Sequence, residues 1–127
     1  MLQALPSPDL QVFVVWIPIL ASDTFEAARS AAGRFGDRRI RHYWDPRRAL
    51  GVALGKALGL PPSKRERGRE TGVAWDVYLL YPRGARWGDA APLPSFWMHQ
   101  LEQLEGSPQP ALDAAALRAS VERAQQR

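Results

Sequence analysis

The chain has 127 residues, of which 46% are apolar and 24% charged, and its formal net charge is +4. These values are typical of one globular domain and exclude a mainly disordered chain. The chain contains no cysteine, which excludes disulfides, zinc–thiolate sites and cysteine nucleophiles. Its longest apolar run, residues 12–21, is about half of a membrane span. Because the N-terminus also lacks a basic leader, we expect a soluble, cytoplasmic protein without a membrane partner.

The first half of the chain predicts two strand–helix units. Residues 10–17 (LQVFVVWI) form an almost unbroken apolar run, typical of a central strand covered on both faces. Asp23 begins a capping-box-like sequence, and the helix that follows it is expected to end at Gly36. Residues 38–44 (RRIRHYW) alternate, with charge on one face, as in an edge strand. An amphipathic helix is predicted over residues 50–58.

The second half begins with the one clear loop, residues 63–72 (SKRERGRETG), which is polar and locally basic. Residues 73–81 (VAWDVYLLY) predict a second buried strand, interrupted only by Asp76. Turn residues 82–84 and a short strand at residues 85–87 follow, so these two strands predict a hairpin.

The C-terminal part predicts a helix over residues 95–105, with Trp97 on its core face. The tail, residues 111–127, has weak helical periodicity and is either a docked accessory helix or a frayed end. We therefore expect a main domain over residues 1–108 and an accessory segment over residues 109–127.

This order of elements resembles that of the thioredoxin family, and the resemblance covers residues 8–105. The motif VVW at residues 14–16, followed by Pro18, is similar to the family's first strand and active-site turn. The resemblance implies a thioredoxin-like three-layer sandwich, an α/β fold with a four-stranded mixed central sheet flanked by helices. Segments that further resemble cysteine-less thioredoxin-like proteins of bacteria are residues 15–18, 42–45, 74–78 and 96–100.

The sequence departs from the family at the redox centre. Ile17 and Leu20 stand where the family has its Cys-x-x-Cys pair, and no proline precedes the expected hairpin strand. Thiol–disulfide exchange requires a thiolate, so the family's oxidoreductase activity is excluded. The resemblance therefore implies a fold and not an activity.

In the expected topology, three tryptophans and three carboxylates meet at the carboxyl ends of the strands, where open α/β sheets bind ligands. One interpretation is an aromatic-walled pocket for a cation, an amine or a metal. The structural alternative is that the tryptophans fill the core and two of the acids only cap helices. Asp76 interrupts an apolar strand, and a buried carboxylate needs a partner. The predicted binding residues are Trp16, Ile17, Pro18, Asp23, Trp44, Asp45, Trp75 and Asp76.

The sequence has no metal-ligand spacing and no phosphate-loop motif, so we expect no metal and no cofactor. His42 is expected in the core and His99 in solvent. We expect a non-catalytic thioredoxin-like module that binds a protein or a small ligand at the former active-site end. The alternative is an enzyme that uses Asp76 with Asp45 or His42 as acid–base groups.

Two further partners follow from surface residues. The basic loop could bind an anion, but it contains no interleaved aromatic residue, so we do not expect a nucleic-acid partner. Trp87 and Trp97 could form a flat homodimer contact, since tryptophan is enriched at interfaces.

Overall fold

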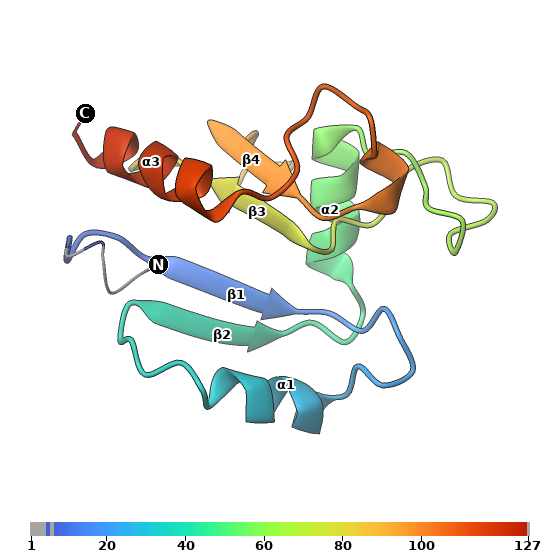
Figure 1. Cartoon of the computed structure of the whole chain (residues 1–127). Coiled ribbons are helices and arrows are strands. Elements are labelled where there is room, and N and C mark those ends of the chain that lie inside the picture. The colour runs from blue at the N-terminus through green and yellow to red at the C-terminus, as the bar shows by residue number, and fades with distance from the viewer. Residues whose placement is uncertain (1–4, 6, 127) are drawn as a thin grey trace. The chain divides into compact units, whose positions relative to one another are not determined.

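The computed structural model describes residue 5 and residues 7–126. They form two compact units, the first ending at Ala49 and the second beginning at Leu50. In the first unit, strand β1 (Val12–Trp16) pairs in parallel with β2 (Ile40–Trp44), and helix α1 (Phe25–Ala32) connects them (Figure 1). The β-branched run of β1 and the alternation in β2 favour these strands, as predicted.

The two faces of this sheet differ in what covers them. On one face, the Phe25 ring meets the Trp44 ring edge-on at 6.4 Å between centroids, and Phe35 lies 5.5 Å from the His42 ring. On the other face, Phe13 and Tyr43 are 60% and 50% exposed. The expectation that this apolar strand is covered on both faces is therefore wrong.

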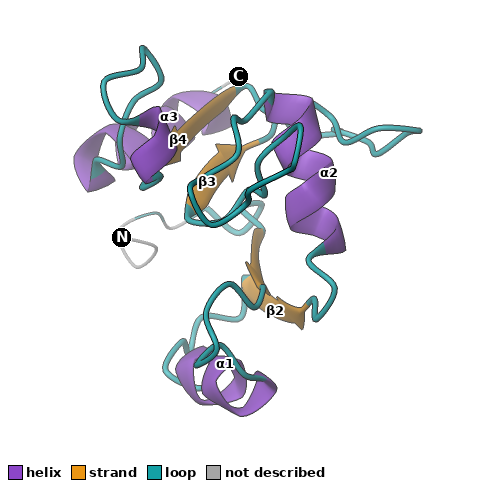
Figure 2. Ribbon diagram, turned by 90° about the vertical axis from the view of Figure 1, so that its right-hand side faces the viewer, coloured by secondary structure: helices purple, strands orange, loops and turns teal. Residues whose placement is uncertain are grey.

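The second unit contains two paired strands, and these lie between two helices in both views (Figure 1 and Figure 2). The strands pair antiparallel, with Val77 opposite His99 and Leu80 opposite Phe96. Helix α2 (Ala49–Leu58) starts one residue before the first residue of this unit. The other elements of the unit are β3 (Val77–Leu80), β4 (Phe96–His99), a 3-10 turn η2 (Glu102–Leu104) and α3 (Ala114–Gln125).

The core of the second unit forms where α2 meets the segment before β3. Gly55 lies so close to that segment that a Cβ atom there would be 1.8 Å from the Gly72 carbonyl oxygen. The buried apolar cluster consists of Leu54, Leu60, Ala74, Ala91 and Leu101, with Trp75 and Trp97 packed against it.

The expected four-stranded mixed sheet, and with it the thioredoxin-like sandwich, is wrong. The described residues form two sheets of two strands each, β1–β2 and β3–β4. The predicted strand at residues 85–87 is loop, and β4 occupies the beginning of the predicted helix at residues 95–105. The aromatic run of β4 is β-prone, and the Ser95 N–H donates to the Leu80 carbonyl at 2.8 Å instead of starting a helix.

The C-terminal tail forms helix α3. Its cap is Asp113, whose carboxylate accepts the Ala116 N–H at 2.7 Å, and Leu117 and Val121 are buried. Among the described residues, no helix has the length and apolarity needed to cross a membrane.

Candidate functional site

Five of the predicted binding residues lie together at the carboxyl end of β1 and β2. Trp16 and Trp44 are register partners, so their side chains emerge on the same face. The Asp45 N–H donates to the Trp16 carbonyl at 2.9 Å, which holds both chain exits together. Ile17 and Pro18 continue directly from β1, and all five residues are half-buried. This arrangement places two indoles and the Asp45 carboxylate at a single edge of the sheet, and the Asp23 carboxylate lies beside it, against the Ile19 N–H.

The acids at this edge stabilise local turns. The Asp23 carboxylate accepts the N–H groups of Ile19 and Leu20 at 2.9 and 2.6 Å, and the Asp45 carboxylate accepts the Arg47 N–H at 3.2 Å. The cap of α1 is Thr24 and not Asp23, because the Thr24 hydroxyl accepts the Ala27 N–H. The Asp23 carboxylate therefore holds the turn before α1, and the Asp45 carboxylate holds the turn before α2. The expectation that these two acids cap the helices is wrong, although their role in the turns is structural.

His42 is held by a neighbouring indole. The Trp16 Nε1–H donates to His42 Nδ1 at 3.2 Å, and the two rings stack at 18° with centroids 6.1 Å apart. An accepting Nδ1 leaves the proton of the neutral imidazole on Nε2. That nitrogen is buried and has no hydrogen-bond partner among the described residues. A base must reach its proton, so this packing gives no support to His42 as a general base.

Trp75 and Asp76 belong to the second unit. Trp75 packs against the apolar cluster of that unit. Asp76 is exposed, so the expectation of a buried carboxylate is wrong at this position. Its φ of 49° is a left-handed conformation that Asp tolerates, and its carbonyl accepts the Gln100 N–H at 2.9 Å. The acid–base pairing of Asp76 with Asp45 or His42 stays a prediction.

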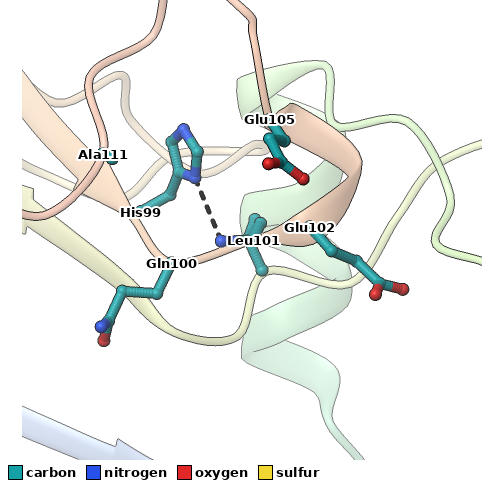
Figure 3. Close-up of a pocket in the computed structure, with 6 residues that line it drawn as sticks. All are labelled: His99, Gln100, Leu101, Glu102, Glu105 and Ala111. Carbon is teal, nitrogen blue, oxygen red and sulfur yellow. Dashed lines mark hydrogen bonds between the residues drawn. The ribbon is translucent and has the colours of Figure 1, made fainter.

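The sequence did not indicate a hollow of about 280 Å³ beside the end of β4 (Figure 3). The chain leaves β4 at His99 and returns at Ala111, which pairs with His99 in an isolated parallel bridge. The only sequence signal for this loop is the turn-forming run at residues 106–110, between the helix predicted over residues 95–105 and the tail. The lining residues are His99, Gln100, Leu101, Glu102, Glu105 and Ala111.

His99 holds this loop closed. Its Nδ1 accepts the Leu101 N–H at 3.1 Å, as the dashed line in Figure 3 shows, and its Nε2 donates to the Gln109 carbonyl at 3.2 Å. One accepting and one donating nitrogen define the neutral Nε2–H tautomer. The side chain is 3% exposed, so the expectation of a solvated histidine is wrong. His99 is therefore a structural element of the loop.

The described residues contain no group of three or more His, Cys, Asp or Glu side chains arranged to hold a metal ion. The chain matches no protein-family model, no curated protein and no solved structure.

Proposed function

We propose that this chain is a non-catalytic binding module that takes a protein partner at the carboxyl end of β1 and β2. The observation that carries the proposal is apolar surface beside the paired indoles. Phe25 is 50% exposed and meets the Trp44 ring edge-on, and Leu20, in the turn after β1, is 49% exposed. Exposed aromatic side chains next to half-buried ones are typical of the anchors of protein interfaces.

The polar groups at the same edge favour binding over chemistry. Asp23 and Asp45 accept backbone N–H groups, and the Nδ1 atom of His42 accepts the Trp16 indole proton. A general acid or base needs a proton-transferring atom that a substrate can reach. These bonds occupy atoms that would otherwise do such work, and they fix the turns that carry the apolar side chains.

Site-directed photocrosslinking tests the proposal. A photoreactive phenylalanine analogue replaces Phe25 in one variant and Leu93, which is 70% exposed in the second unit, in a control variant. We expect a discrete adduct in the native cells from position 25 and none from position 93. When the photoreactive analogue is placed at position 20 instead, Phe25→Ser or Trp44→Ala should remove the adduct. The circular dichroism spectrum of Phe25→Ser should stay unchanged, which would show that the variant is folded. A small-molecule adduct would narrow the partner to a ligand, and equal labelling from positions 25 and 93 would refute the site.

A further inference from the structure

One face of the β1–β2 sheet carries exposed aromatic side chains and is not used by the proposed site. Phe13 lies opposite Arg41 and Val15 lies opposite Tyr43 in the register, so these four side chains emerge together. We call them the outer face. They point away from the face of Trp16, His42 and Trp44, which carries the contacts with the Phe25 and Phe35 rings.

The outer face presents two aromatic rings as a platform. The Phe13 and Tyr43 rings lie 6.3 Å apart between centroids at an interplanar angle of 31°, and they are 60% and 50% exposed. A diagonal pair of this kind, across one step of the register, stabilises the sheet only modestly. Both rings therefore keep aromatic surface that a flat ligand could cover.

A cation stands beside this platform. Arg41 is exposed directly opposite Phe13, and no ion pair or hydrogen bond of its side chain is present among the described residues. Asp37, the acid just before β2, is paired with Arg39 at 2.6 Å. The guanidinium of Arg41 is thus available to an anionic group, within a chain whose net charge is +4.

We infer that the outer face binds single-stranded nucleic acid, with bases stacked on Phe13 and Tyr43 and a phosphate on Arg41. Bases stack on exposed aromatic rings whatever their sequence, and arginine contacts the backbone beside them. The basic loop at residues 63–72 lacks aromatic residues, which disfavours stacking there; the sheet brings rings and a cation together from β1 and β2. A membrane or an acidic peptide would use the charge but does not require two flat rings side by side.

Fluorescence anisotropy with a labelled oligothymidylate of about eight nucleotides tests this inference. We expect Phe13→Ala and Tyr43→Ala each to weaken binding roughly tenfold. Arg41→Gln should reduce the slope of log affinity against log salt by about 0.7, as the loss of one phosphate contact predicts. Trp87→Ala and Arg38→Gln are matched controls, since both residues are exposed outside the outer face, and neither should change binding.

Stability measurements on the same variants separate a platform from a covered core. If the outer face is free, Phe13→Ala should shift the thermal midpoint by less than about 3 °C. A fall of about 10 °C or more would mean that the side chain is a core residue and would overturn the inference. The inference would also be overturned if the oligonucleotide did not bind saturably, or if Trp87→Ala weakened binding as much as Phe13→Ala does. It would be overturned as well if the protein bound phosphatidylglycerol vesicles as tightly as the oligonucleotide and the same variants lost that binding.

Discussion

A Gly55→Ala substitution should destabilise the second unit, because α2 has no room for a methyl group at this position. The added Cβ atom would lie 1.8 Å from the Gly72 carbonyl oxygen and 3.3 Å from the Ala74 backbone nitrogen. The obstacle is backbone, so no side-chain rotation relieves the clash. Either α2 or the segment at residues 72–74 must move by more than 1 Å, roughly the difference between 1.8 Å and an ordinary contact.

That segment is held by three consecutive hydrogen bonds. The N–H groups of Gly72, Val73 and Ala74 donate to the Leu60 carbonyl at 2.8 Å, to the Glu66 carboxylate at 2.7 Å and to the Gly51 carbonyl at 2.8 Å. Weakening two of them costs about 2 kcal/mol, and overpacking adds about 2 kcal/mol. Alanine regains about 1 kcal/mol of helix propensity. The net loss is therefore about 3 kcal/mol, or about 10 °C in the thermal midpoint.

Urea unfolding followed by tryptophan fluorescence measures this loss. The matched control is Gly33→Ala at the end of α1, where φ is −62° and the nearest atom to an added Cβ is an ordinary 3.5 Å away. That variant should change the free energy of unfolding by less than about 0.5 kcal/mol. A Gly55→Ala protein as stable as the wild type would refute the close approach of α2 to this segment.

Three other predictions concern titratable side chains. His99→Ala should lower the free energy of unfolding by about 3 kcal/mol, because it removes the hydrogen-bond partners of one buried N–H and one carbonyl. Urea unfolding measures this loss, and a smaller loss in His99→Asn would agree with that cause. Hydrogen bonds from the Arg39 side chain and then from its backbone N–H lower the pKa of Asp37 from 3.8 to about 2. The stabilisation by this group is therefore present above about pH 4 and lost as the pH falls through about 2. In Arg39→Gln, which keeps the backbone N–H, carboxyl NMR titration should show a pKa raised part of the way towards 3.8, and an unchanged pKa would contradict the pairing. Burial, and then the charge of Asp76, raise the pKa of the Tyr78 hydroxyl. The stabilisation that this hydroxyl contributes is therefore present below its ordinary pKa near 10 and is lost as the pH rises through the raised pKa. Absorbance titration should show a lower Tyr78 pKa in Asp76→Asn, and an unchanged pKa would rule out the carboxylate as a cause.

The strand–helix alternation of the first half was predictable because each element has its own local signal. The apolar run before Ile17, the helical spacing after Asp23 and the alternation around His42 predict β1, α1 and β2, and these elements are confirmed. The predicted end of α1 at Gly36 is wrong, because the helix ends at Ala32 with Gly33 as its cap. Helix α2 is confirmed as well, and its Gly55 lies close to the loop segment at residues 72–74.

The second half was misassigned because a short aromatic run fits two periods. Trp97, Leu101 and Leu104 have helical spacing, yet Phe96 to His99 is also a β-prone segment, and four residues do not distinguish the two. Pairing with β3 decided the outcome, since the partner strand supplies the hydrogen bonds that an isolated turn of helix lacks. His99 is buried and its ring bonds to the loop that follows β4, which no local sequence pattern could reveal.

Of the candidate site, the sequence could predict only the residues that the pairing of β1 with β2 brings together. Parallel neighbours have their carboxyl ends at the same edge of a sheet, and the register of β1 with β2 brings Trp16, Trp44 and Asp45 together there. A grouping that also includes Trp75 and Asp76 depends on the four-stranded sheet, which does not form among the described residues. The roles of the acids depend on single hydrogen bonds to turn backbone, which composition and spacing do not encode.

The apolar sequence of β1 favours burial of its side chains, but it does not specify whether the chain itself or a binding partner buries them. In the folded first unit, Phe13 is 60% exposed and Tyr43 is 50% exposed, both on one face of the sheet. Fully burying an aromatic side chain is worth about 1.5–3 kcal/mol, so a large part of that free energy remains available to whatever binds there. A surface residue retained only for strand propensity could as well be valine or threonine, which are equally β-prone and less sticky. Two rings beside an uncompensated guanidinium are thus better explained by a flat, anionic partner than by the needs of the strand.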